Sequence, residues 1–272
     1  MRPGWMWGWA AWFVAATAWA EAPAPAEAPA PPAARERASH RLSIGGGIVS
    51  IGQQDRGYSP LIFAGAQGAA EARYSRVKRR RELLFTLGAS TGTLRNRHGR
   101  ALDALTLRLL VVNLYPLGED SPFSLGWSND NQFSSRNIAG FLNFTGRSDY
   151  FTSFGPAASY EQGFTLFGQS FSASVLSHVQ LLGFYLPSGY VSSLPRGFGY
   201  EPGDFMGSLT RSIFGFYPGS AISLGLRPEL AWTWGGRSSL VFAYDYAFVA
   251  LRQVHASRRS QGTFLLSLRV SL

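Results

Sequence analysis

The side chains that could perform catalysis are few and widely separated in this sequence of 272 residues. It contains 4 His and no Cys, which excludes a thiol nucleophile and a disulfide framework. Ser177 precedes His178, but neighbouring residues of an extended strand point to opposite sides, so the two cannot act as nucleophile and base. His98 lies in a basic segment, residues 95–100, that contains no nucleophile. We therefore expect no catalytic residue.

Metal and cofactor sites are not indicated either. The His residues lack a ligand spacing such as His-x-x-x-His. Residues 128–132 (SNDNQ) are rich in oxygen, but alternating strand directions would separate these side chains, and the twelve-residue calcium loop is absent. Residues 45–47 (GGG) lack the helix and Lys of a phosphate-binding loop, so these glycines predict close strand packing. We expect no metal and no cofactor.

The elements that would position polar side chains are strands, as the last eleven residues, 262–272, show. One face carries Phe264, Leu266, Leu268, Val270 and Leu272, and the other is polar except for Leu265. Such alternation indicates that one face contacts an apolar phase and the other a polar one. This segment resembles the closing strand of bacterial outer-membrane β-barrels, with Leu272 in place of the usual terminal Phe or Trp. The resemblance implies that the barrel-assembly machinery reads this strand as a partner.

The rest of the chain predicts an all-β fold, a transmembrane antiparallel up-and-down β-barrel of about ten strands, with eight or twelve as alternative counts. After residue 20 no stretch reaches the roughly 20 apolar residues of a membrane helix, and a membrane protein without such helices must be a closed barrel. Pro156 and Pro228 fall inside predicted strands and indicate bulges or shifted boundaries. The predicted strands are 42–51, 61–76, 83–94, 101–115, 122–133, 150–160, 168–184, 221–234, 239–252 and 262–272.

The connections predict which end of the barrel faces outward. If the C-terminus is periplasmic, every second connection before it is periplasmic too and should be short. The segments 235–238, 161–164, 117–121 and 77–82 are all short. The longest connections, about 135–149 and 186–218, fall at the opposite end, as expected for outer loops.

Charged and polar residues on the inward face of the predicted strands form a candidate lumen network. Both signs of charge are present, and a ten-stranded barrel leaves little free lumen. Because buried charges need partners, we expect these side chains to plug the interior with ion pairs and hydrogen bonds. The candidates are Glu71, Arg73, Arg108, Asp130, His178, Gln180, Arg227, Glu229, Asp245 and Arg269.

A second set of basic residues falls in connections predicted to lie outside the cell: Arg95, Arg97, Arg100, Arg258 and Arg259. The chain carries a net charge of +9. In a secreted protein, phosphates of outer-membrane lipid and lipopolysaccharide are more plausible partners for such charge than nucleic acid. A solvated basic turn is the alternative interpretation. We expect lipid and lipopolysaccharide contact, no nucleic acid, and a monomer.

The N-terminus predicts secretion. Arg2 precedes an apolar run, and Ala18-Trp19-Ala20 is a small-x-small cleavage site, so residues 1–20 are predicted to be a signal peptide cleaved after Ala20. Residues 21–40 are predicted to be an Ala/Pro-rich periplasmic linker, and residues 41–272 the barrel. Together these features predict the outer membrane of a Gram-negative bacterium.

The sequence favours a binding, narrow-transport or structural role. A lipid or peptide hydrolase with its site at the outer rim is an alternative, although the family signatures are missing. Ten-stranded outer-membrane proteases use paired aspartates and an Asp-His couple, whereas this chain has no Asp-x-Asp and no Asp beside a His. Outer-membrane phospholipases and lipid A deacylases share a His-x-Ser motif, whereas Ser177 here precedes His178. The other alternative is a soluble secreted β-sandwich, which also alternates.

Overall fold

The structure, a computed structural model, describes residues 39–56, 59–78, 81–119, 121–137, 147–187, 213–252 and 256–272. The predicted signal peptide and residues 21–38 of the predicted linker lie outside these ranges. The first strand begins at Ser39, two residues before the predicted start of the barrel. Within the described ranges, no helix is long and apolar enough to cross a membrane.

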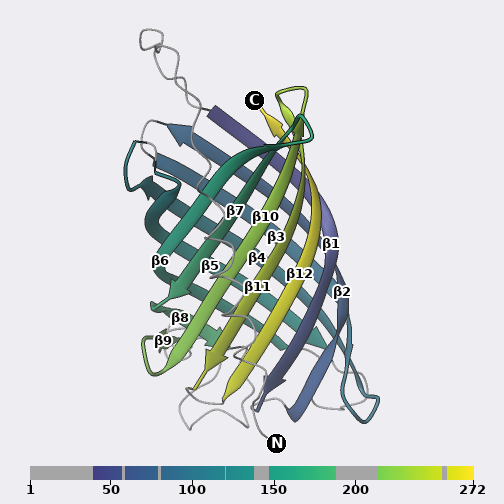
Figure 1. The fold of residues 1–272 in the computed structure, drawn as a ribbon. Coiled ribbons are helices and arrows are strands. Elements are labelled where there is room, and N and C mark those ends of the chain that lie inside the picture. The colour runs from purple at the N-terminus through teal and green to yellow at the C-terminus, as the bar shows by residue number, and fades with distance from the viewer. Residues whose placement is uncertain are drawn as a thin grey trace, which may run out of the picture. The chain divides into compact units, whose positions relative to one another are not determined.

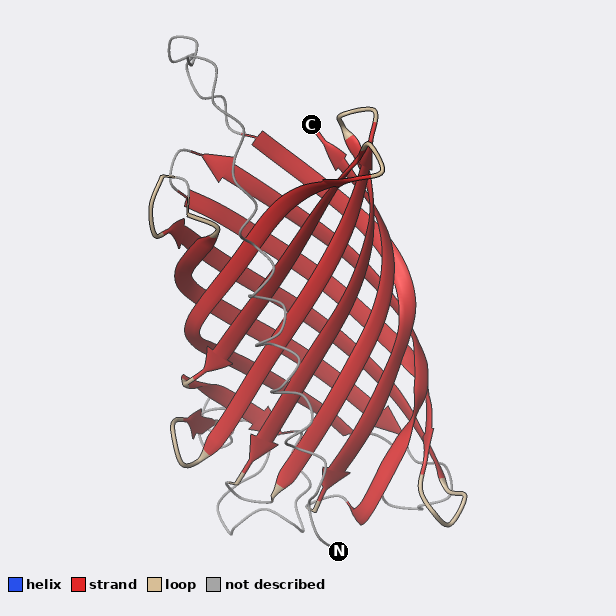
Figure 2. Cartoon of the chain, viewed as in Figure 1, coloured by secondary structure: helices blue, strands red, loops and turns tan. Residues whose placement is uncertain are grey.

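The chain forms a closed antiparallel barrel of ten strands, as predicted (Figures 1 and 2). Neighbours along the chain pair with each other, and β1 pairs with β12 to close the ring. Two short strands extend the wall: β8 continues β7 along β6, and β9 pairs with β8. The strands are β1 (Ser39–Asp55), β2 (Ser59–Lys78), β3 (Arg81–Arg95), β4 (Ala101–Pro116), β5 (Phe123–Asn137), β6 (Arg147–Leu166), β7 (Gln169–Gln180), β8 (Leu182–Pro187), β9 (Phe214–Phe216), β10 (Ala221–Trp234), β11 (Ser238–Leu251) and β12 (Ser257–Ser271).

The polarity of the wall is the reverse of that in a soluble protein. Large apolar side chains point outward, and Phe264 is 67% exposed. A soluble β-sandwich would bury this face, so the alternation matches a wall that meets hydrocarbon. The exposed outward set includes Ile44, Ile48, Leu87, Leu107, Phe242, Leu266 and Leu268. The buried inward set includes Gln67, Thr86, Ser128, Ser153, Gln180, Ser223 and Thr263.

Two apolar clusters also lie inside the barrel, where the sequence predicted mainly polar side chains. One lies in the halves of β1 to β4 next to the β1–β2 and β3–β4 connections, and it consists of Val49, Ile51, Phe63, Leu94, Leu102 and Ala104. The other consists of Leu84, Leu110, Val112, Leu114, Ala157 and Leu176 and lies nearer the opposite end. These clusters exclude water from the interior and strengthen the electrostatic interactions between the charged groups beside them.

One part of the outward face, on β5 and β6, is polar. Asn131 Oδ1 accepts hydrogen bonds from Tyr150 (3.0 Å) and Thr152 (2.8 Å). Its amide donates to Asn129 Oδ1 at 2.6 Å, and the Asn129 amide donates to the carbonyl of Ser153 at 3.0 Å. The cluster satisfies its own hydrogen bonds, which is the condition for keeping polar groups against hydrocarbon.

Both prolines occupy positions where a neighbouring ladder has a gap. Pro156 lies between the β6–β8 ladder, which ends at Phe154, and the β6–β7 ladder, which begins at Ala157. Pro228 lies where the β10–β11 ladder is interrupted between Leu226 and Glu229. Because proline has no backbone N–H, these gaps let it stay within a strand.

Several predicted boundaries were wrong. The predicted turn at 161–164 is strand, because β6 continues to Leu166 and the turn is Phe167-Gly168. Both turn residues have positive φ, 52° and 74°, as a two-residue hairpin turn matched to the strand twist requires. At the other end of the barrel, β12 begins at Ser257, five residues earlier than predicted.

We call the end with the C-terminus and the short turns the turn end, and the opposite end the loop end. The C-terminus and the β10–β11 turn lie together at the top of Figure 1. Residues 96–100, which join β3 to β4, lie at the loop end. Most of the two longest predicted connections, 135–149 and 186–218, lies outside the described residues.

Candidate functional site

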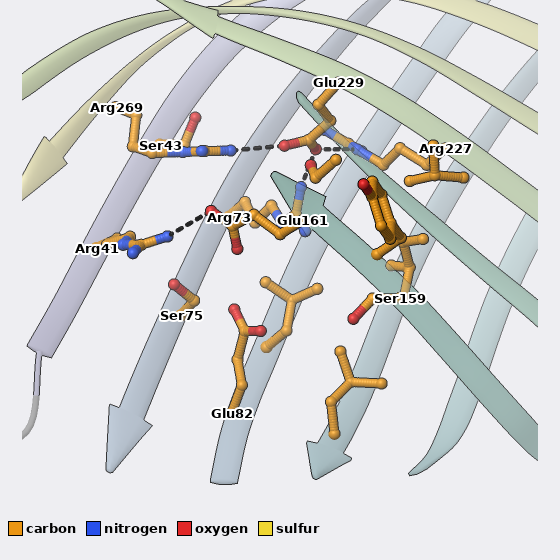
Figure 3. Close-up of a pocket in the computed structure, with 16 residues that line it drawn as sticks. Arg41, Ser43, Arg73, Ser75, Glu82, Ser159, Glu161, Arg227, Glu229 and Arg269 are labelled. Atoms are coloured by element: carbon orange, nitrogen blue, oxygen red, sulfur yellow. Dashed lines mark hydrogen bonds and ion pairs between the residues drawn. The ribbon is translucent and has the colours of Figure 1, made fainter. Parts of the chain in front are cut away.

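A group of ion pairs across the lumen forms the first half of the candidate site. Arg227 on β10 makes a bidentate contact with Glu71 on β2, both N–O distances being 2.6 Å. Its Nε also donates to Glu229 Oε1 at 2.6 Å. Glu229 accepts from Arg269 on β12 at 2.6 Å and from Arg73 on β2. One carboxylate therefore serves three arginines, as Figure 3 shows.

The second half is built around Arg108 on β4. Its guanidinium contacts Asp130 through Nε (3.0 Å) and Nη2 (2.9 Å). Its Nη1 donates to Asp245 Oδ2 on β11 at 3.2 Å. In the closed ring β4 and β11 stand opposite each other, so this bond spans the lumen. Arg227 also approaches Asp245, at 3.6 Å, and joins the two halves.

The structure thus places all ten predicted lumen residues in one connected network. Glu71, Arg73, Arg108, Asp130, Arg227, Glu229, Asp245 and Arg269 belong to it through ion pairs. His178 and Gln180 join it through hydrogen bonds to Arg108 and to each other. The alternation along each strand predicted that these side chains point into the lumen. The residues that pair with each other are up to 156 positions apart in the sequence.

His178 does not have the surroundings of a catalytic base. Its Nε2 lies 3.2 Å from Arg108 Nη2, and a guanidinium nitrogen can only donate, so this ring nitrogen is not free to take a proton from a nucleophile. Its Nδ1 lies 3.0 Å from the Gln180 amide. Among the described residues, no serine or carboxylate hydrogen-bonds to this ring. Nor do the described residues bring together three side chains from His, Asp and Glu that could hold a metal.

Gly225 explains how the ring fits into the wall. A Cβ built on Gly225 would lie 2.0 Å from His178 Nε2 and 2.4 Å from Cε1. The two residues are cross-strand partners on β10 and β7. The missing side chain leaves the space that the imidazole occupies, which holds Nε2 against Arg108.

The empty spaces beside the network are small. The cavity at the turn end, drawn in Figure 3, measures about 50 Å³ and is lined by Arg41, Ser43, Arg73, Glu82 and Glu229 among others. A second cavity of about 50 Å³ lies beside Glu71 and Arg108. Each has room for only a few water molecules. These spaces suit bound water or small ions rather than a drug-sized ligand.

Sequence reasoning missed a third charged group at the loop end. Arg136 on β5 pairs with Asp55 on β1 at 3.2 Å and with Asp149 on β6. The predicted strand ended at residue 133, which left Arg136 in a connection. Side chains at even-numbered positions of β5, such as those of Ser128 and Asp130, point inward. Extending the predicted strand to residue 136 with the same alternation would have placed Arg136 inside the barrel.

The basic residues predicted to contact phosphate do not all lie outside. Arg95, Arg97 and Arg258 are exposed, and Arg100 lies in the same exposed connection as Arg97. The prediction for Arg259 was wrong, because β12 begins early enough to include it and its parity directs it into the lumen. There its guanidinium donates to Thr106 (2.9 Å), Ser134 (3.0 Å) and Gln261 (2.8 Å).

The connection at residues 96–100 is ordered by one side chain. Asn96 Oδ1 accepts from the backbone N–H groups of His98 (2.9 Å) and Arg100 (3.0 Å). Gly99 has a φ of 77°, which closes the turn. Arg95 donates to the Gly99 carbonyl at 3.3 Å. This tight turn presents its arginines at the loop end as a preformed basic surface.

Comparison with solved structures identifies the architecture. The outer membrane protease OmpT from Escherichia coli aligns with a TM-score of 0.52 and 6% identity over 86% of this chain and 97% of that chain. The fold is that of an outer-membrane β-barrel. Ail of Yersinia pestis aligns with this barrel at a TM-score of 0.36 and 10% identity over 87% of this chain and 100% of that chain. The translocator domain of autotransporter NalP from Neisseria meningitidis aligns with it at 0.35 and 9% over 85% and 88%.

No family model matches the sequence of this barrel, and no curated protein sequence does. At these identities the structural likeness establishes the fold and leaves the activity to be argued from the site.

Proposed function

We propose that this chain is an outer-membrane barrel with a plugged lumen, whose function is binding at its outer rim rather than solute flow. The observation that carries the proposal is the Arg108–Asp245 bond, which joins opposite walls of the ring. The Arg227–Glu71 pair also crosses the lumen, from β10 to β2. A conducting pathway would have to break these contacts.

The plug is expected to be durable because its charges are enclosed. Arg227 and Glu229 are 6% and 7% exposed, and apolar clusters lie nearby. Removing one partner of a buried pair typically costs about 3–5 kcal/mol, because the other charge is left uncompensated. Opening a pore through the network would incur several such costs together.

The binding role is supported by the loop end. Arg95, Arg97 and Arg100 surround the turn held by Asn96, and Arg258 is exposed at the same end of β12. Arginine matches phosphate geometry through its planar set of N–H donors. We propose lipopolysaccharide phosphate as the partner of this surface. We further propose that the barrel is a monomer and that the barrel-assembly machinery recognises β12.

Planar-bilayer recording tests the plug. The refolded barrel is expected to show no steady open state, whereas an Arg108→Ala/Arg227→Ala double variant should give measurable conductance, because both lumen-crossing contacts are lost. Migration that differs between unheated and boiled samples would verify that each protein is folded. Steady conductance of the unaltered barrel would refute the plug.

Lipopolysaccharide binding tests the outer surface separately. An Arg95→Gln/Arg97→Gln/Arg100→Gln variant should bind less lipopolysaccharide and lose most of the salt dependence of binding. Arg237→Gln, in the exposed β10–β11 turn at the opposite end, is the matched control. Equal loss in both variants would show that the attraction is general to the positive charge of the protein.

A further inference from the structure

Arg259 is the exception among the lumen arginines. The other lumen arginines that the structure describes each contact a carboxylate: Arg41, Arg73, Arg108, Arg136, Arg227 and Arg269. The three acceptors of Arg259 are two hydroxyl groups and an amide, all neutral. Its Nε is buried and has no hydrogen-bond partner among the described residues. A half-buried guanidinium inside the barrel without a contacting carboxylate is costly, so this position calls for an anion.

Among the described residues, no carboxylate contacts Arg259. In the ladders on either side, Arg259 pairs with Gln53 on β1 and with Val249 on β11, which are both uncharged. The nearby carboxylates of Asp55 and Asp149 contact Arg136 instead. The chain therefore places a positive charge at the loop end of the lumen and commits its adjacent acids to another arginine.

A cavity opens beside this charge. It measures about 60 Å³, and its lining includes Gln53, Ser134, Arg136, Asp149, Arg258 and Arg259. Asp149 contacts Arg136. Gln53 is 9% exposed, and its Nε2 is a second buried donor without a partner in the described chain. Two unpartnered N–H groups from neighbouring strands and one positive charge without a contacting carboxylate are the features of an anion site. The volume admits a compact anion and excludes a long one.

We propose that this cavity binds a compact carboxylate or inorganic oxyanion, with Arg259 as its charged partner and Gln53 as its second donor. The site goes beyond the proposed role of the barrel, because it requires neither conductance nor lipopolysaccharide. The anion completes the hydrogen bonds of both side chains and fastens β1 to β12 at the loop end. Binding should therefore stabilise the folded barrel.

Thermal unfolding in detergent tests the proposal. The folded fraction is measured by the difference in gel migration between unheated and boiled samples. Sodium formate replaces sodium gluconate at constant ionic strength, since formate fits the cavity and the hydroxylated chain of gluconate does not. Saturating formate should raise the unfolding midpoint of the unaltered barrel by roughly 2–4 °C, the shift expected for a modest ligand on a barrel of this size. An unchanged midpoint would overturn the proposal.

Two variants and one control locate the effect. Arg259→Gln keeps a polar side chain but removes the charge, so its midpoint should not respond to formate. Gln53→Glu places a carboxylate directly across the ladder from Arg259, so it should raise the midpoint and abolish the response. Arg252→Gln, an exposed position at the same end, should respond like the unaltered barrel. A full response in Arg259→Gln, or none in Arg252→Gln, would overturn the site.

Discussion

Replacing Glu229 with Gln should destabilise the barrel far more than any exposed acid-to-amide change. The Glu229 side chain is 4% exposed, and its carboxylate contacts Arg73, Arg227 and Arg269. Glutamine keeps the shape but removes the charge, and only Arg227 retains other carboxylates, Glu71 and Asp245. Breaking one buried pair costs about 3–5 kcal/mol, so the loss should reach at least that range. For a domain of this size that lowers the unfolding midpoint by roughly 6–20 °C.

Urea unfolding of the refolded barrel in detergent, read by gel shift, measures this loss. Asp103→Asn is the matched control, because Asp103 is exposed and its hydrogen bond to Thr93 (2.6 Å) lies on the surface. The control should lose less than about 1 kcal/mol. Adding Arg73→Met to Glu229→Gln should recover part of the loss, since one stranded charge is removed. Equal losses for Glu229→Gln and Asp103→Asn would refute the view that the network stabilises the barrel.

Two further outcomes follow from the wall of the barrel. Gly225→Ala should cost about 1–3 kcal/mol in urea unfolding because its Cβ overlaps the His178 ring, whereas Gly68→Ala, with nothing within 4 Å, should cost under about 1 kcal/mol; equal costs would mean that the ring moves freely. Leu266→Arg, on the outward face near the middle of β12, should lower the free energy of unfolding in lipid by about 2–4 kcal/mol. Leu117→Arg, in the turn after β4, should lower it much less. Equal costs at the two positions would argue against a hydrocarbon phase at Leu266.

The strand count, the direction of most side chains and the presence of short turns at one end were predictable, although the turn expected at 161–164 lies at 167–168. They depend on period-two alternation, which is a local property of the chain. Boundaries at the loop end were less accurate, because strands there extend past the apolar band and their last residues no longer alternate in hydropathy. Arg136 and Arg259 were both misplaced for this reason, one left in a connection and the other assigned to the outer surface.

The partners within the lumen could not be predicted from the sequence. Parity placed Glu71 and Arg227 on the inner face, but their contact joins residues 156 positions apart and depends on the stagger of the whole ring. The same holds for the apolar clusters, which occupy inward positions where local patterning predicts polar residues.

The sequence by itself determined that this chain alternates as a membrane barrel does and which charges within the predicted strands turn inward, because alternation fixes the face of every residue in a strand. Only the tertiary structure decided which charges meet, because register and closure set distances between strands remote in sequence. Closure brought three arginines to Glu229, whereas Arg259 contacts only neutral acceptors among the residues that the structure describes. That difference, which no local pattern encodes, separates the plug of the lumen from the proposed anion site.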